Sequence, residues 1–223
     1  METSAGMLGK ELSIMKKRIL CFGDSNTWGY NGENGERFDE YIRWTGRLQR
    51  LLGSEYTVIE EGQNGRTTVW DDPIENRLAG LTYLWPCMES QSPFDLIIIM
   101  LGTNDTKTYF SQSPRNIAAG AARLVRTAQA SAFGPDHKSP EVLLVSPIRV
   151  EFHESFDGMF GQQAAEKSLG FSEQFKIAAD ETGCHFLDAS LYAGPGKADG
   201  VHLSPEGHEA LAEALYEKVT EIC

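Results

Sequence analysis

The sequence predicts an α/β protein of three layers, in which a flavodoxin-like, five-stranded parallel sheet lies between helices. Two observations favour this fold class. Short apolar runs alternate with amphipathic segments along the chain. The central run, FDLIIIMLG at 94–102, is almost continuously apolar, as a strand covered on both faces should be. Right-handed crossovers then place helices on both faces of the sheet.

Five segments are expected to be strands, with helical patterns between them. The strands are RILCFG (18–23), YTVIEEG (56–62), FDLIIIMLG (94–102), EVLLVSP (141–147) and CHFLDA (184–189). Helices are expected near 38–52, 114–132, 160–182 and 204–221, with a weaker pattern near 75–90. The last helix has the clearest start, because Ser204 suits the N-cap and Pro205 the first helical position.

The length of 223 residues and the hydrophobic content of 41% suit one domain with a full core. We expect residues 15–223 to form that domain and residues 1–14 to be a flexible leader, because Met15 offers an alternative start. The formal net charge is −12, without a long run of lysine or arginine. This charge argues against a nucleic acid or an anionic membrane as a partner.

The cysteines and the apolar runs bear on the compartment. No apolar run approaches the roughly 18 residues that span a bilayer, so no membrane partner is expected. The four cysteines are scattered, without a C-x-x-C pair: Cys21, Cys87, Cys184 and Cys223. Cys21 and Cys184 lie in apolar, strand-like runs and are interpreted as buried small hydrophobes. Scattered cysteines are most simply explained by reduced thiols, so we expect a cytoplasmic protein.

Residues that could support acyl transfer follow the predicted strands. Ser25, Gly65 and Asn104 follow the first three strands, and Asp199 and His202 precede the final helix. Ligands bind outside the carboxyl ends of strands in such sheets, so these side chains are expected to meet. A serine hydroxyl needs a base, which a histidine oriented by a carboxylate supplies. A glycine N–H, an asparagine amide and the serine's own N–H can stabilise an oxyanion.

Each of these residues also has an ordinary structural interpretation when taken alone. Ser25 at a strand end could be a helix N-cap, Asn104 could bridge a turn, and His202 could lie on the surface. Their joint occurrence in chain order favours catalysis. Asp24 and Asp105 are expected to accept hydrogen bonds from backbone N–H groups of turns.

Four motifs together resemble the four blocks of the SGNH hydrolases, or GDSL-type esterases: GDSN (23–26), Gly65, GTND (102–105) and DGVH (199–202). The resemblance extends from about residue 17 to the end of the chain. It is strongest to the small arylesterase and acyltransferase branch, which shares phrases similar to RWTG, VIEEG, RTT, DDP and MLGTNDTK. It implies that Ser25 is the nucleophile, His202 the base and Asp199 the carboxylate that orients the base.

The resemblance also implies an oxyanion hole formed by the Ser25 N–H, Gly65 and Asn104. Gly62 is the alternative to Gly65, although it ends the strand and is better suited to a turn. Asn26 stands where the family name has leucine. That position does not touch the expected proton relay, so little weight is given to the difference.

Aromatic residues beside the expected site are candidates for the pocket wall: Trp28, Tyr30, Phe152, Phe156 and Phe160. Aromatic walls suit small acyl or aryl groups. The same residues could equally belong to the core or to a contact between subunits. Members of the related branch tend to form homo-oligomers that narrow access to the site, so a homo-oligomer is expected. A dry pocket could favour an alcohol or peroxide over water as acyl acceptor.

The sequence therefore predicts a serine esterase that cleaves small acetyl or aryl esters through an acyl-enzyme, without a cofactor. No metal is expected, since His153-Glu154 lacks a second histidine and His137, His185 and His208 have no partner pattern. No G-x-S-x-G elbow or P-loop is present. Two alternatives stay open: a carbohydrate O-deacetylase on the same residues, and a catalytically silent module that binds esters or glycans. A lysophospholipase is a weaker alternative.

Overall fold

The structure, a computed structural model, describes residues 16–156 and 158–223, so the proposed leader at 1–14 lies outside the described residues. Five strands form one sheet in the order β2-β1-β3-β4-β5, and every neighbouring pair is parallel. The strands are β1 (Lys17–Gly23), β2 (Tyr56–Gly62), β3 (Leu96–Met100), β4 (Glu141–Ser146) and β5 (His185–Asp188). The predicted fold class, with five parallel strands between helices, is confirmed.

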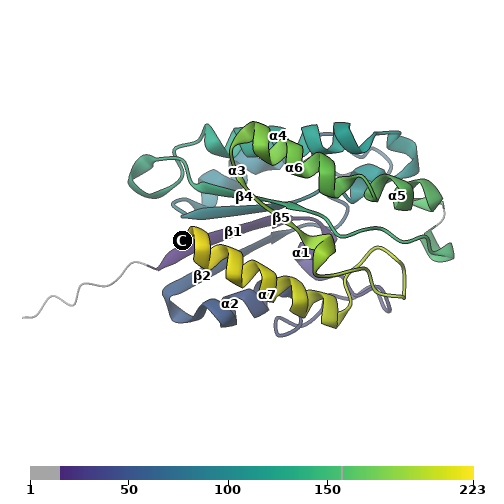
Figure 1. Cartoon of the computed structure of the whole chain (residues 1–223), viewed down its shortest axis with the longest axis horizontal. Helices are drawn as coiled ribbons and strands as arrows, with labels where there is room; N and C mark the ends of the chain where they lie inside the picture. Colours follow the sequence, from purple (N-terminus) through teal and green to yellow (C-terminus); the bar gives the residue numbers. More distant parts are fainter. Residues whose placement is uncertain (1–15, 157) are drawn as a thin grey trace, which may run out of the picture.

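Helices cover both faces of the sheet (Figure 1). One face carries α2 (Trp44–Leu52) and α7 (Pro205–Ile222), and the other carries α3 (Gly80–Gln91), α4 (Pro114–Gln129) and α6 (Phe171–Thr182). Strand β1 contributes side chains to the core on each face of the sheet, because successive side chains point to opposite faces. Ile19 and Cys21 pack with α2 and α7, whereas Leu20 and Phe22 pack with α3, α4 and α6.

Three of the expected helices differ in extent from those in the structure. Helix α2 begins only at Trp44, because Asp39 starts a turn whose carbonyl accepts the N–H of Arg43. The helix expected over 160–182 is two helices, α5 (Gly161–Ser168) and α6, which are separated by a turn at Gly170. The pattern near 75–90 yields α3 only from Gly80, since residues 72–77 form a separate turn.

The start of α7 is as predicted. Pro205 is its first residue, and the Ser204 hydroxyl accepts a hydrogen bond from the Gly207 N–H at 3.2 Å. Of the two cysteines expected to be buried, Cys21 is fully buried, but Cys184 is only partly buried. Cys184 precedes β5, an edge strand that is covered less completely than the centre of the sheet.

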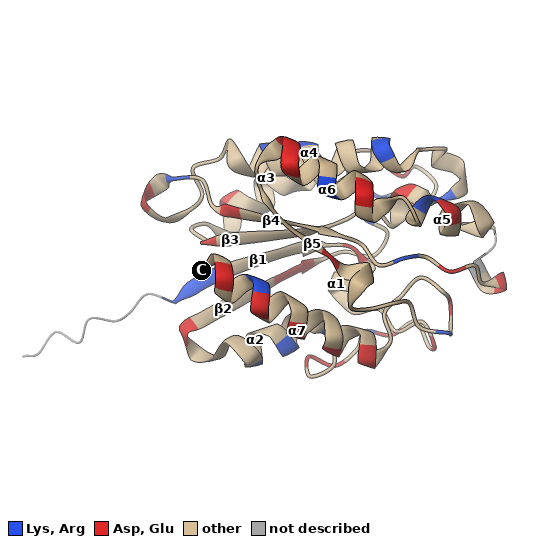
Figure 2. Ribbon diagram, viewed as in Figure 1, with Lys and Arg blue, Asp and Glu red and all other residues tan. Residues whose placement is uncertain are grey.

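Charged residues occur on the helices, in the loops between elements and on the strands. Acidic and basic residues both occur along α6 and α7, and acidic residues are in excess on both helices (Figure 2). None of the helices in the described ranges has the length and apolarity that a membrane span requires.

Candidate active site

The first site residue lies where β1 passes into a short helix, α1 (Ser25–Trp28). The helix is capped by Asp24, whose Oδ1 accepts the Asn26 N–H at 2.9 Å. Asp24 therefore has the turn-capping role predicted for it. The interpretation of Ser25 as an N-cap is wrong, because Ser25 is already the first helical residue and its side chain does not serve the helix.

The Ser25 hydroxyl is directed at His202. Its Oγ lies 2.9 Å from His202 Nε2, although the two residues are 177 positions apart in the chain. On the other side of the ring, His202 Nδ1 lies 2.7 Å from Asp199 Oδ2. When Nδ1 donates its proton to this carboxylate, Nε2 is left as the acceptor for the serine hydroxyl. The three side chains form one continuous hydrogen-bonded chain.

Asp199 is itself fixed in place. Its Oδ1 accepts the N–H groups of Val201 and His202, both at 2.9 Å. Burial acts to raise the pKa of Asp199. The hydrogen bond and positive charge of His202, together with the backbone donors, outweigh burial and hold the pKa below its usual value. The carboxylate is therefore ionised at neutral pH and can stabilise an imidazolium at His202.

Asn26 has a role that the sequence prediction did not recognise. Its Oδ1 accepts the Leu203 N–H at 2.9 Å, and its Nδ2 donates to the Val201 carbonyl at 3.3 Å. Asn26 thus holds the backbone on both sides of His202 while standing next to Ser25. No periodicity in the sequence points to this contact, because it joins segments 175 residues apart.

Two further loops bring candidate oxyanion donors to the same place. Gly65 and Asn104 both line a cavity that also contains Ser25. Asn104 Nδ2 donates one of its hydrogens to the Arg66 carbonyl at 3.1 Å, which leaves the second hydrogen for another acceptor. Gly65 has a φ of +78°, a conformation that favours glycine.

Gly62, the alternative to Gly65, does not line this cavity. It ends β2 directly against α1, where a Cβ atom would lie 2.2 Å from the Trp28 nitrogen. The close approach of two backbones explains a glycine at this position.

The cavity beside Ser25 has a volume of about 390 Å³. Its lining residues are Ser25, Tyr30, Asn64, Gly65, Glu75, Arg77, Asn104, Met159, Phe160 and His202. Aromatic and apolar side chains form one part of the wall, and polar and charged side chains from the loops after β2 and β3 form another. The Tyr30 ring packs on the imidazole of His202, with 4.3 Å between the ring centroids.

The structure therefore corrects the predicted pocket wall. Trp28 does not line the cavity and instead lies under the Arg37 guanidinium, 5.3 Å from its ring. Phe152 is 46% exposed and also outside the lining. The side chain of Phe156 lies outside the described residues. Of the predicted aromatics, Tyr30 and Phe160 line the cavity.

Glu75 and Arg77 are lining residues that sequence reasoning missed. They belong to the turn at 72–77, whose backbone is closed by two hydrogen bonds of 2.8 Å between Asp72 and Arg77. The signal available was the charged segment DDPIENR, which follows the second strand and Gly65. Charged residues in a loop are ordinarily solvated, so charge alone could not indicate which of them line a pocket.

Asp105 is buried completely beside Asn104, and its carboxylate accepts a backbone N–H as predicted, but from Thr68 in the loop after β2 and not from its own turn. It accepts the Thr68 N–H at 3.0 and 3.1 Å and the Thr68 hydroxyl at 2.5 Å. Burial raises its pKa to about 6, and it raises the pKa of Asp24 to about 6 as well. Within the described ranges, no group of three or more His, Cys, Asp or Glu residues is placed to hold a metal ion.

A Ser–His–Asp chain at the carboxyl edge of a parallel sheet, between two layers of helices, is the arrangement of a serine hydrolase. The model of the GDSL-like lipase/acylhydrolase family matches residues 21–210. The chain belongs to this family, whose members are also called SGNH hydrolases, and its enzyme class is that of the carboxylic ester hydrolases.

Three similar proteins illustrate the range of the family. An aryl esterase from M. smegmatis is 40% identical over 93% of this chain and 100% of its own, with a TM-score of 0.88. A carbohydrate acetylesterase from Sinorhizobium meliloti is 39% identical over the same shares, with a TM-score of 0.89. A curated acetylxylan esterase from Xylanibacter ruminicola is 23% identical over 89% of this chain, which spans 42% of that relative's length.

Proposed function

We propose that this protein is a serine esterase that cleaves small carboxylic esters through an acyl-enzyme on Ser25. One observation carries the proposal. Ser25 Oγ, His202 and Asp199 form a chain with distances of 2.9 and 2.7 Å, and Ser25 and His202 line a cavity of about 390 Å³. A volume near the lower end of the roughly 300–1,000 Å³ of ligand pockets suits a small ester.

The residues divide the work of acyl transfer. Ser25 Oγ attacks the ester carbonyl while His202 Nε2 takes its proton, and Asp199 stabilises the imidazolium that forms. The oxyanion accepts hydrogen bonds from the Ser25 and Gly65 N–H groups and the second hydrogen of Asn104 Nδ2. His202 then returns the proton to the leaving alcohol. An acceptor molecule then gives its proton to His202 and attacks the acyl carbonyl. The bond to Ser25 Oγ breaks, Ser25 takes that proton back from His202, and the acylated acceptor leaves.

The acyl acceptor is water in the simplest case. The side chains of the relay are nearly dry, since Ser25 is 6% and His202 is 8% exposed. A site with little water favours transfer to an alcohol or peroxide that enters with its own binding contacts. We therefore include acyl transfer in the proposal. Detection of hydrolysis alone when one ester is supplied in water with added alcohol would reject it.

An acetylated carbohydrate is the second candidate substrate. Glu75, Arg77 and Asn64 line the cavity together with its apolar residues, and such groups hydrogen-bond sugar hydroxyls. Two of the similar proteins carry names that refer to carbohydrate acetyl esters. Comparing kcat/KM for acetylated sugars with that for aryl acetates separates the two candidates.

Assembly and compartment complete the proposal. Ile74 and Leu78 are 68% and 61% exposed on the loop that forms one side of the cavity, and a second copy of the chain would cover such residues. We therefore expect a homo-oligomer in solution.

All four cysteines are unpaired, which suits the reducing cytoplasm.

The decisive experiment is p-nitrophenyl acetate hydrolysis by the wild type and by Ser25→Ala, with circular dichroism as the check on folding. Turnover should fall by about 10⁴-fold or more, because the covalent route is lost. Equal rates in both proteins, or no turnover in either, would contradict the proposal. The silent ester-binding or glycan-binding module would then be the better interpretation.

A further inference from the structure

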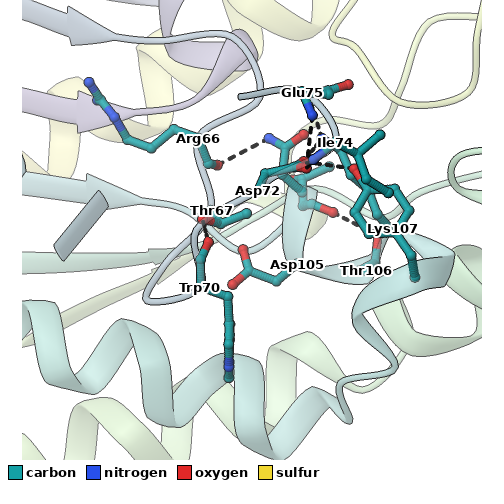
Figure 3. Close-up of polar contacts among 12 residues, drawn as sticks. Arg66, Thr67, Trp70, Asp72, Ile74, Glu75, Asp105, Thr106 and Lys107 are labelled. Carbon is teal, nitrogen blue, oxygen red and sulfur yellow. Dashed lines mark hydrogen bonds and ion pairs between the residues drawn. The ribbon is translucent and has the colours of Figure 1, made fainter. Parts of the chain in front are cut away.

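Side chains of the turn at 104–107 connect that turn with the loop at 63–77 (Figure 3). The turn at 104–107 follows β3, and the loop at 63–77 follows β2. Asn104 donates to the Arg66 carbonyl, and Asp105 accepts two groups of Thr68. Because each loop supplies one candidate oxyanion donor, these contacts set the distance between the donors.

Lys107 makes the third connection. Its Nζ lies 2.9 Å from Asp72 Oδ2 and 2.8 Å from Glu75 Oε2. The Lys107 side chain is 1% exposed, that of Asp72 is 0% and that of Glu75 is 28%. A buried ammonium group must be paired, so Lys107 fixes both carboxylates and the turn that carries them.

Asp72 anchors the turn at 72–77. Its Oδ1 accepts the N–H groups of Ile74 and Glu75 at 3.1 Å, and its Oδ2 accepts the Tyr109 hydroxyl at 2.7 Å. Burial acts to raise the pKa of Asp72, but the hydrogen bonds from Tyr109 and Lys107 outweigh it and hold the pKa low. The group is thus a charged, fully bonded anchor.

Glu75 lies between Lys107 and Gly65 and contacts both. A Cβ atom placed on Gly65 would lie 2.7 Å from Glu75 Oε2, so the carboxylate packs directly against the Gly65 backbone. The Lys107 N–H donates to the Asn104 carbonyl at 3.3 Å. Lys107 therefore contacts the Asn104 turn through its backbone and reaches Gly65 through the side chain of Glu75.

We propose that Lys107 is a positioning residue that acts through Glu75 to hold the Gly65 N–H and the Asn104 amide at the spacing an oxyanion needs. This inference rests on the proposed esterase function. The ester carbonyl of the ground state is a weaker acceptor than the oxyanion, so misplaced donors cost the transition state more than the bound substrate. Loss of the connection should therefore lower kcat and leave KM nearly unchanged.

Glu75→Ala breaks the connection while the buried pair of Lys107 and Asp72 stays intact, and Glu75→Gln is its matched control because the amide oxygen can still accept from Lys107. We expect kcat for p-nitrophenyl acetate to fall about tenfold or more in Glu75→Ala, within the ~10²-fold that a 1 Å misplacement can cost. Glu75→Gln should recover part of the rate that Glu75→Ala loses, because its amide oxygen can still accept from Lys107. The affinity for a trifluoromethyl ketone, which mimics the tetrahedral intermediate, should fall by the same factor as kcat.

A double-mutant cycle tests whether Lys107 acts through Glu75. In Lys107→Met the second change, Glu75→Ala, should add almost nothing to the loss of kcat, because the connection is already broken. Lys107→Arg should restore part of the rate. Lys176→Met, which removes an exposed lysine paired with Asp180, should leave the rate unchanged. If Lys107→Met does not fold, the comparison of Glu75→Ala with Glu75→Gln decides alone.

Wild-type kcat in Glu75→Ala, a rise in KM without a loss of kcat, or independent losses that multiply in the double variant would each overturn the inference. Failure of the proposed function is a different result. It would show as an absence of Ser25-dependent turnover in the wild type, before any variant is compared.

Discussion

At the scale of single residues, Gly32 shows how closely the surrounding chain approaches the hydrogen-bonded chain of Ser25, His202 and Asp199. A Cβ atom on Gly32 would lie 2.3 Å from Asp199 Oδ2, which is far inside contact distance. The backbone at this point covers the carboxylate, and only a residue without a side chain allows this. The φ angle of Gly32 is not in the left-handed region, so close approach alone accounts for the glycine.

Gly32→Ala should therefore displace the Asp199 carboxylate and lower kcat by roughly 10- to 100-fold, because a misaligned orienting group costs rate steeply. The backbone can accept alanine, so the thermal midpoint should change by only a few degrees. Gly194→Ala is the matched control, since nothing lies within 4 Å of a Cβ there. Steady-state kinetics of both variants check this, and full activity in Gly32→Ala would contradict it.

At the scale of elements, the loop that carries Asp199 and His202 runs directly into α7. The helix buries Leu211 and Leu215 in the same core as Leu48 of α2. Its first turn is held by the Ser204 cap, two residues after His202. The position of the base is thus coupled to the start of a helix whose far side is anchored in the core.

Ser204→Ala should lower the free energy of unfolding by about 1 kcal/mol, since the N–H of Gly207 loses its acceptor. Ser204→Asp keeps an oxygen at the cap and should stay close to wild type. Urea denaturation of the three proteins measures the effect. Equal midpoints for Ser204→Ala and the wild type would show that the cap does not stabilise the fold.

At the scale of the whole molecule, buried titratable groups set how stability varies with pH. His208 is fully buried, and burial together with nearby Arg47 and Arg43 lowers its pKa from 6.5 to about 3. The unfolded chain takes up this proton near pH 6.5 and the folded chain does not, so His208 costs stability as pH falls from about 6.5 to 3. Asp24 and Asp105 act in the opposite direction, because burial raises their pKa to about 6. Their contribution is full below about pH 4 and is lost as pH rises through 6.

His208→Asn removes the loss of stability that His208 causes at low pH and leaves the contributions of Asp24 and Asp105 unchanged. The amide oxygen can still accept the Trp44 N–H, which donates to His208 Nδ1 at 3.2 Å in the wild type. Whatever its stability at pH 7, the variant should lose less stability, or gain some, between pH 7 and pH 4. Urea unfolding at pH 7, 5.5 and 4 gives the slopes, and parallel curves for the two proteins would contradict the assignment to His208.

The sequence predicted the sheet and the convergence of Ser25, Asn104 and His202 because both follow from short-range patterns. Apolar runs mark strands, and residues after parallel strands share one edge of the sheet. The pocket wall could not be predicted in this way. Trp28 lies under Arg37, and Glu75 reaches the cavity through the turn that Asp72 closes, and neither contact follows from a periodic pattern in the sequence.

The break between α5 and α6 escaped prediction for a related reason. The helical pattern continues across Leu169 and Gly170, and an isolated glycine within such a pattern is often tolerated. In the structure, Gly170 lies against Pro114 at the start of α4, where a Cβ would be 3.1 Å from two proline carbons. A contact between distant segments thus requires a glycine at the break, and such a contact is not visible in the helical pattern.

The distance of 177 positions between Ser25 and His202 has a consequence for synthesis on the ribosome. The proposed nucleophile is made first, and the proposed base follows much later, just before α7, which docks on α2. A nascent chain that has not yet released α7 holds a serine without a relay, so it cannot acylate itself or its neighbours. Ester turnover should therefore begin only after α7 has docked, and a pulse of synthesis followed by an activity assay would time that step directly.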